Sequence, residues 1–208
     1  MHIEKMMKKS GLLAVYSFLD ASYHDDVMTK RVKYENDAIC LVASEDEKIV
    51  GLIGVEIEKK PKTLCVASSH RGAVIWNLAV LPQYRRRHIA LDLWKEARKK
   101  LLEKGIHYCE VWTQQDEAAN RWYQSQGFKN IEEYNWLRCY IESRKAVHFF
   151  DHQHAGKIYG VDELVIKTEC SRRKELSDNC DRMEEVRLYV LDLIEDFDRG
   201  SSAPKGCF

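Results

Sequence analysis

Three consecutive arginines and a histidine stand between an apolar stretch and a long amphipathic one. The apolar stretch ends at Leu81 and Pro82. A loop that opens directly into a helix N-terminus aims unpaired backbone N–H groups and the positive end of the helix dipole at one point, which is a ready site for phosphate. Positive side chains are unfavourable there without an anion, so a phosphate ligand explains the arginines better than a solvated basic turn does. The candidate phosphate-binding residues are Arg85, Arg86, Arg87, His88, Ile89 and Ala90.

Hydrophobic periodicity predicts the elements on either side of this turn. Residues 73–81 form an apolar run that predicts a strand. In residues 89–104 the apolar side chains recur at helical spacing, basic residues gather near the end, and Gly105 terminates the helix. Residues 106–113 predict the next strand. A strand–helix–strand unit of this length implies a right-handed parallel crossover.

A second short helix is predicted after this unit. Asp116 opens it and Gly127 ends it. The stretch from Ala119 to Phe128 reads ANRWYQSQGF and carries Asn120 and Tyr123 on the helix. This segment matters because it follows the phosphate-suited turn by about 30 residues, with a helix and a strand between them.

In this order the two segments resemble the Gcn5-related N-acetyltransferases (GNAT) over roughly residues 10–141 and 184–195. The pyrophosphate signature of that family, Q/R-x-x-G-x-G/A, is similar to Arg85–Ala90, and its A-x-x-x-Y-x-x-x-G-F helix is similar to Ala119–Phe128. The chain departs from the family at Arg86 and His88, where glycine is usual. Because the first turn of a helix has negative φ, we expect both residues to fit without glycine.

The resemblance implies an α+β, three-layer fold with a mixed, mostly antiparallel central sheet flanked by helices. We expect one domain over residues 1–197, with an insertion at 142–183 before the last strand and a disordered tail at 198–208. The remaining predicted elements are a helix at 11–23 with Ser10 as N-cap, strands at 38–43, 49–57, 128–141, 163–166 and 186–191, and a loop at 59–72 that carries an extension of strand around residues 64–66.

The resemblance also implies a reaction, the direct transfer of an acetyl group from acetyl-CoA, as co-substrate, to an amine in a ternary complex. Tyr123 is then the candidate acid that protonates the departing thiolate. Main-chain groups of Leu78 and Val80 would pair with the pantetheine arm and polarise the thioester carbonyl. Asp116 lies where relatives contact the coenzyme, although it is better explained as a helix N-cap, and Asn120 is a lesser candidate for such a contact.

The sequence does not identify the general base. Asn77 lies at a central-strand position where relatives carry an acid, and an amide cannot take a proton. Glu56 and Glu110 are alternatives, but each is equally well an outward-facing strand residue, and a water chain to bulk solvent is a further option.

Composition narrows the class of protein. The chain has 208 residues, 45% hydrophobic and 32% charged, and its 33 basic and 33 acidic residues give no net charge. This balance argues against a nucleic-acid or membrane-surface protein. No apolar run approaches the roughly 20 residues of a membrane helix, no signal peptide is evident, and seven scattered cysteines suit free thiols in a reducing cytoplasm.

Several alternatives stay open at this point. A non-catalytic acetyl-CoA-binding sensor of the same fold is the second functional hypothesis, and transfer of a larger acyl group is the third. The amine is a small molecule, a peptide N-terminus or a lysine, and a homodimer is compatible with the fold. The insertion carries His148, His152 and His154, but their spacing matches no zinc pattern, so no metal is expected; the insertion is better explained as a cover for the acceptor pocket, lined or anchored by Phe149, Phe150 and Tyr159.

Overall fold

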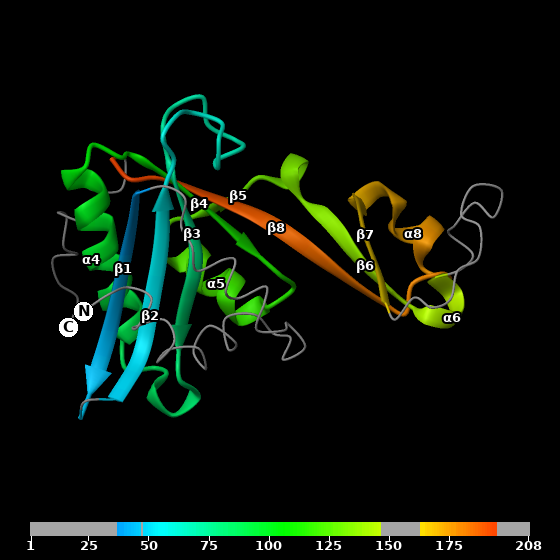
Figure 1. Cartoon of the computed structure of the whole chain (residues 1–208), viewed down its shortest axis with the longest axis horizontal. Coiled ribbons are helices and arrows are strands. Elements are labelled where there is room, and N and C mark those ends of the chain that lie inside the picture. The colour runs from blue at the N-terminus through cyan, green and yellow to red at the C-terminus, as the bar shows by residue number, and fades with distance from the viewer. Residues whose placement is uncertain (1–36, 47, 147–162, 195–208) are drawn as a thin grey trace, which may run out of the picture. The chain divides into compact units, whose positions relative to one another are not determined.

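The computed structural model describes residues 37–46, 48–146 and 163–194. The chain divides into unit 1, residues 1–111 and 190–208, and unit 2, residues 112–189. The helix predicted at 11–23 and the predicted tail lie outside the described residues. Eight strands with antiparallel and parallel pairing, flanked by helices, confirm the predicted α+β class with a mixed sheet (Figure 1).

Unit 1 is built on β1, β2, β3 and the first part of β4. The strands β1 and β2 pair antiparallel, as do β2 and β3, whereas β3 and β4 pair parallel as the predicted crossover requires. A 3₁₀ turn, η1, and the helix α4 make the crossover. The bounds are β1 Asp37–Glu45, β2 Lys48–Ile57, β3 Ala73–Val80, η1 Pro82–Tyr84, α4 Ile89–Glu103 and β4 Tyr108–Thr113.

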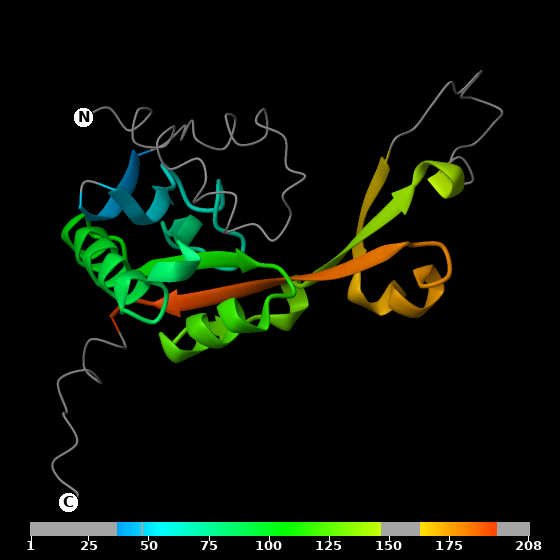
Figure 2. The same cartoon turned by 90° about the horizontal axis from the view of Figure 1, so that it is seen from below.

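The helix α4 covers one face of β1, β2 and β3 (Figure 2). Its buried side chains recur at helical spacing and are Leu93, Trp94, Ala97 and Leu101. The first turn approaches β2 closely, because a Cβ at Gly51 would lie 2.8 Å from a methyl of Ile89. The helix ends as predicted, with Lys104 as C-cap and Gly105 at φ 70°. Packing of α4 on the sheet therefore fixes the direction in which its N-terminus points.

Unit 2 contains α5 and a three-stranded antiparallel arrangement in which β6 lies between β8 and β7. The short strand β5 also pairs with β8. A small core of Leu137, Cys139 and Leu176 lies under η4 and α8. The bounds are α5 Glu117–Ser125, β5 Lys129–Asn130, η2 Glu132–Tyr134, β6 Trp136–Glu142, α6 Ser143–Ala146, β7 Glu163–Glu169, η4 Cys170–Arg172, α8 Arg173–Leu176 and β8 Arg182–Asp192.

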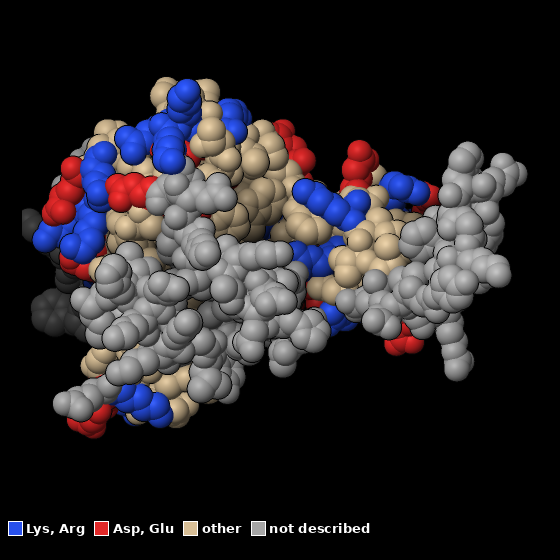
Figure 3. All heavy atoms as spheres, in the orientation of Figure 1, with Lys and Arg blue, Asp and Glu red and all other residues tan. Residues whose placement is uncertain are grey.

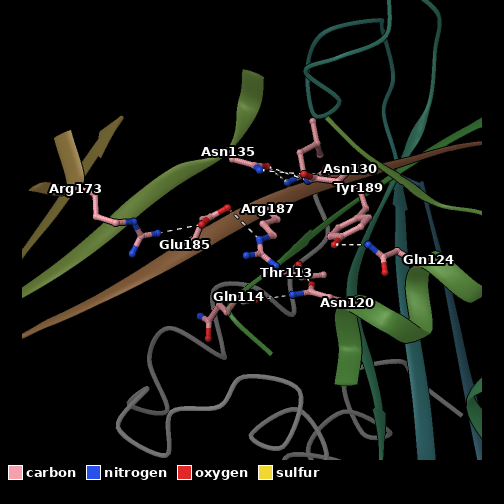
Figure 4. A network of polar contacts seen from close by, with 11 residues as sticks. Thr113, Gln114, Asn120, Gln124, Asn130, Asn135, Arg173, Glu185, Arg187 and Tyr189 are labelled. Atoms are coloured by element: carbon pink, nitrogen blue, oxygen red, sulfur yellow. Dashed lines mark hydrogen bonds and ion pairs between the residues drawn. The ribbon is translucent and has the colours of Figure 1, made fainter. Parts of the chain in front are cut away.

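Two strand predictions are wrong. Residues 64–66 form no strand, because their N–H groups bind buried carboxylates instead of a neighbouring strand. The single strand predicted at 128–141 is broken by η2. There the side chains of Asn130 and Asn135 bond to each other at 3.1 Å and to the backbone of Leu188, which takes the place of ladder bonds (Figure 4). The strand predicted at 163–166 is confirmed as part of β7.

Candidate functional site

The edge of β3 that faces away from β2 is open over its last residues. The N–H of Leu81 bonds to the carbonyl of Val50 on β2 at 2.9 Å. Because successive residues of a strand point their N–H groups to opposite sides, those of Val80 and Leu78 face away from β2. Parallel pairing with β4 covers only Ala73–Ile75 on that side. Among the described residues, the main-chain groups of Leu78 and the N–H of Val80 are thus available to an extended ligand, whereas the carbonyl of Val80 accepts a bond from Arg85.

A bulge separates the paired and the open parts of β3. Val55 on β2 lies opposite Ile75, and Gly54 lies opposite Asn77, so Trp76 is the extra residue. A bulge bends its strand and increases the local twist. The bend lies where pairing with β4 stops, so it turns the last residues of β3 away from that partner.

In the turn after β3, the backbone is not helical at the two positions where the resembled family usually has glycine, so that expectation was wrong. Arg86 has φ 62° and His88 has φ 61°, so both are left-handed. The helix begins at Ile89 as predicted, with His88 as its N-cap, and the expectation failed because it gave helical φ to residues of the turn that precede the helix. Glycine adopts this conformation freely, whereas other residues are strained there. The chain therefore keeps the backbone shape that glycine favours without having glycine.

The N-terminus of α4 has no side-chain cap. The first helical bond runs from the N–H of Asp92 to the carbonyl of His88 at 2.9 Å. Among the described residues, the N–H groups from Arg86 to Leu91 have no partner. Consecutive N–H groups in a turn with left-handed residues, followed by a helix N-terminus, form a concave site for an anion. The unpartnered N–H groups include those of the predicted residues 86–90, whereas the N–H of Arg85 is bonded to the carbonyl of Pro82 at 3.3 Å.

The arginine side chains of this turn are only partly explained by an anion. Arg85 donates from Nε to the carbonyl of Val80 at 3.2 Å. Arg87 lies 3.5 Å from the carboxylate of Glu45 and 5.2 Å from the ring centroid of Tyr84. Both charged partners of this ion pair are about half exposed, so the pair contributes little to stability. In Figure 3, blue and red atoms lie at the lower edge of unit 1, over the end of the β1–β2 hairpin and the turn.

The hairpin brings one cation that the sequence analysis missed. Lys48, at the start of β2, lies 5.9 Å from the ring centroid of Tyr84. Its position depends on the antiparallel register of β1 with β2 and of β2 with β3, which no local pattern around Lys48 reveals. Lys48 and Tyr84 therefore join the residues beside the candidate phosphate site.

The carboxylates considered as general bases are not outward-facing. The side chain of Glu56 is 6% exposed and accepts a bond from the indole Nε1 of Trp76 at 2.8 Å. Glu110 is fully buried and accepts bonds from the N–H groups of Val66 and Ala67 and from the hydroxyl of Tyr108, at 2.8–3.0 Å. Asn77 is also buried. The expectation of solvent-facing positions failed because both faces of β2 and β4 are covered at these residues.

Unit 2 positions the polar residues of the second motif around α5 (Figure 4). Asp116 is the N-cap of α5 and accepts from the N–H groups of Ala118 and Ala119 at 2.8 and 3.1 Å, so its capping role is confirmed. Asn120 is 4% exposed; its Oδ1 accepts from the hydroxyl of Thr113 at 2.5 Å, and its Nδ2 donates to the carbonyl of Gln114 at 3.3 Å. Both residues thus join the end of β4 to α5.

Tyr123 lies on the buried face of α5 and is 7% exposed. Its ring packs edge-on against Trp122, at 5.0 Å between centroids, and against Phe128, at 5.4 Å. The carbonyl of Tyr123 accepts the N–H of Phe128 beyond Gly127, which has φ 89°. The glycine turn and the aromatic contacts hold the phenol in one orientation.

None of the six cysteines in the described part of the chain forms a disulfide. Burial raises the pKa of Cys65 and of Cys109 and raises the pKa of Cys180 to about 12. A thiol reacts as its thiolate, so these groups are poor nucleophiles. No cluster of potential metal ligands occurs among residues 37–46, 48–146 and 163–194, and His148, His152 and His154 lie outside them, as do Phe149, Phe150 and Tyr159. No helix in the same part of the chain is long and apolar enough to cross a membrane.

A comparison with known protein families shows to which family the chain belongs. The sequence profile described as Acetyltransferase (GNAT) family matches residues 10–128, more than half of the chain. The chain belongs to the GNAT acetyltransferase family. The match includes the open end of β3, the turn, α4, and α5 with Tyr123. No curated protein matches the acetyltransferase in sequence.

Solved structures agree on the fold. A protein named smu.2055 from Streptococcus mutans UA159 has a TM-score of 0.53 at 15% identity, with 93% of this chain and 96% of that chain covered. The IAA acetyltransferase of Bacillus cereus ATCC 14579 has a TM-score of 0.52 at 14% identity, with 92% and 95% covered. A Bacillus subtilis acetyltransferase in complex with CoA has a TM-score of 0.50 at 14% identity, with 90% and 93% covered. At such identities the likeness establishes the fold and not the substrate.

Proposed function

We propose that this GNAT acetyltransferase moves an acetyl group from acetyl-CoA to an amine. The observation that carries the proposal is the run of unpartnered N–H groups from Arg86 to Leu91 at the uncapped start of α4. These donors suit the pyrophosphate of the coenzyme, and Arg86, Arg87 and Lys48 supply positive charge around them. The family relation and the CoA bound to a structural neighbour support the same ligand.

The open edge of β3 gives the rest of the coenzyme a path. The pantetheine arm carries amide groups that pair with main-chain N–H and C=O groups as a strand would. Leu78 offers both groups on the side away from β2, and Val80 offers its N–H there, because its carbonyl is bonded to Arg85. One of their N–H groups then polarises the thioester carbonyl and stabilises the oxyanion as it develops.

The transfer itself needs no covalent enzyme intermediate. The amine nitrogen attacks the carbonyl carbon of the thioester, the tetrahedral intermediate collapses, and the carbon–sulfur bond breaks. We assign to Tyr123 the proton that the departing thiolate receives. The raised pKa values of Cys65 and Cys109 agree with direct transfer, because neither of these thiols is a ready nucleophile.

Acetylation of a panel of small amines, peptide N-termini and lysine peptides tests this function. Tyr123→Phe removes the phenolic hydroxyl that would donate the proton and keeps the ring. We expect kcat to fall about 10²-fold or more with little change in coenzyme affinity. Tyr134→Phe, a half-buried tyrosine of η2 outside both motifs, is the matched control and leaves kcat unchanged. Normal turnover in Tyr123→Phe would contradict the acid assignment.

A second function is favoured by the state of the carboxylates. Glu110 is saturated by N–H and O–H donors, and Glu56 is buried against Trp76, so neither is free to take a proton from an amine. A coenzyme-binding sensor without turnover fits this arrangement. Coenzyme binding with no acetylation across the whole panel would favour the sensor, and acetylation of any amine in the panel would exclude it.

A further inference from the structure

The loop between β2 and β3 is built around two fully buried carboxylates. Glu58 and Glu110 are each 0% exposed. In the part of the chain that the structure describes, neither forms an ion pair with a lysine or arginine. An unpaired buried carboxylate is strongly unfavourable unless hydrogen bonds stabilise the charge. The donors that surround the two groups therefore determine how this region holds together.

Five consecutive N–H groups of the loop point at these two carboxylates. Glu58 Oε2 accepts from Thr63, Leu64 and Cys65 at 3.0–3.2 Å. The next two donors bind Glu110, with Val66 and Ala67 at 2.8–3.0 Å from its oxygens. The loop has no strand or helix of its own over these residues. Its backbone is satisfied by side-chain charge instead of by secondary structure.

Further contacts tie the same carboxylates to the strands. Glu58 Oε1 accepts from the N–H of Gly72 at 2.8 Å, next to the start of β3. Glu110 lies opposite Val74 in the β3–β4 pair, just before the pairing ends at Ile75. A Cβ at Gly72 would lie 2.8 Å from Cys65 Sγ and from Tyr108 Cδ1, so the loop is packed closely against β4. The two carboxylates thus connect the loop to the start of β3 and to the part of β4 that pairs with β3.

We propose that Glu58 and Glu110 form an ionisable clamp in which charged Glu58 orders residues 63–65 and 72 and charged Glu110 orders residues 66 and 67. Protonation replaces an acceptor oxygen with an O–H donor in front of groups that are themselves donors. The order that the clamp supplies is therefore complete at neutral pH and is lost on acidification. Glu110 acts in this proposal as a positioning residue and not as the catalytic base.

The titratable groups that face the clamp are a tyrosine and two cysteines. Burial first, and then the charge of Glu110, raises the pKa of Tyr108, whose hydroxyl donates to Glu110 at 3.0 Å. Burial, followed by the charges of Glu110 and Glu58, raises the pKa of Cys65. Burial and the charge of Glu110 raise the pKa of Cys109. All three groups stay neutral around the clamp. Two cations contact backbone carbonyls of this region. Arg71 Nε donates to the carbonyl of Glu58 at 2.8 Å, and Lys62 Nζ donates to the carbonyl of Val66.

Amide hydrogen exchange of the full chain tests the clamp, with protection factors corrected for the intrinsic rate at each pH. The pH is lowered from neutral to the lowest value at which the protein as a whole stays folded, and over this range we expect protection of residues 63–67 and 72 to fall at least about tenfold. The amides of β2 and α4 keep their protection. Loss of protection in all elements together, or in none, would overturn the proposal.

Variants separate the two carboxylates. In Glu110→Gln, Val66 and Ala67 are weakly protected already at neutral pH and lose their acid dependence, whereas residues 63–65 still respond through Glu58. Tyr108→Phe removes one donor from Glu110 without adding a group, and shifts the loss of protection to higher pH. Glu56→Gln is the matched control. Glu56 is also a buried carboxylate and lies on β2, two residues before Glu58, but it accepts its hydrogen bond from the indole of Trp76. Unchanged exchange at 66–67 in Glu110→Gln would refute the clamp.

Discussion

Glycine placed at Arg86 or His88 should stabilise this protein. Both residues are left-handed, with φ near 60°. A residue with a Cβ is disfavoured in that conformation by about 1–2 kcal/mol, whereas glycine enters it freely. Glycine also makes the unfolded chain more flexible, which lowers stability by about 0.4–1 kcal/mol. The difference leaves a net gain of about 0.5–1 kcal/mol at each position.

Alanine at the same positions isolates the backbone effect from the loss of the side chain. The informative quantity is therefore the stability of Arg86→Gly relative to Arg86→Ala, and of His88→Gly relative to His88→Ala. Arg85 is the internal control, because its φ of −66° and ψ of 161° are ordinary extended backbone. Arg85→Gly should be less stable than Arg85→Ala by about 0.4–1 kcal/mol. The sign of this difference is therefore opposite to the sign expected at residues 86 and 88.

Denaturant unfolding at fixed temperature measures these differences, and a thermal scan should show midpoints about 1–4 °C higher for glycine than for alanine at residues 86 and 88. If glycine is no more stable than alanine at either position, the left-handed backbone of the turn is refuted. If Arg85 behaves like its neighbours, the effect does not come from φ.

Further predictions concern single contacts. Asp116→Ala removes the cap of α5 and should lower the free energy of unfolding by about 0.5–2 kcal/mol, whereas Asp116→Asn keeps a capping oxygen and should be nearly neutral; equal effects in denaturant unfolding would argue against the cap. Leu101→Ala, on the buried face of α4, should cost about 2–5 kcal/mol in the same assay, and a loss below about 1 kcal/mol would mean that α4 does not pack as described. Asn120→Ala leaves the buried hydroxyl of Thr113 unpaired and should cost about 1–3 kcal/mol, which unchanged stability would contradict. Lys48→Ala should lower the affinity for acetyl-CoA about two- to fivefold in a binding titration, and the loss should be larger at low than at high salt. A loss of affinity that does not depend on salt would show that Lys48 does not act on the coenzyme through its charge.

Local patterns were sufficient for the elements that carry the site. The apolar spacing of α4 and the glycine at 105 predicted that helix to within a residue, because both signals act within one turn of the chain. Asp116 was correctly considered as a cap for the same reason. The paired motifs indicated the family, which the match to residues 10–128 confirms. The phosphate-suited turn is placed where the sequence predicted it, between β3 and α4.

The failures come from contacts between residues far apart in the sequence. Residues 64–66 look like a strand, but their donors bind Glu58 and Glu110, and Glu110 is 44 residues from Val66. The burial of Glu56 and Glu110 depends on what covers β2 and β4, which hydrophobic periodicity does not report for an acidic residue. Lys48 reaches Tyr84 only through strand register. The helix start at Ile89 was predicted correctly, but the φ of His88 belongs to the turn before the helix, and hydrophobic periodicity does not report the backbone conformation of a turn.

The most direct test of the central claim is a calorimetric titration with acetyl-CoA of the wild-type protein and of Arg87→Glu. Glu45→Gln is the matched control, because it breaks the ion pair with Arg87 without changing the turn. We predict saturable binding to the wild type, within about twofold for Glu45→Gln, and at least about tenfold weaker for Arg87→Glu, since a charge-assisted bond to phosphate contributes roughly 1.5–3 kcal/mol. Wild-type protein that does not bind acetyl-CoA, or binding that Arg87→Glu leaves unchanged, would contradict the assignment of this turn to the coenzyme pyrophosphate.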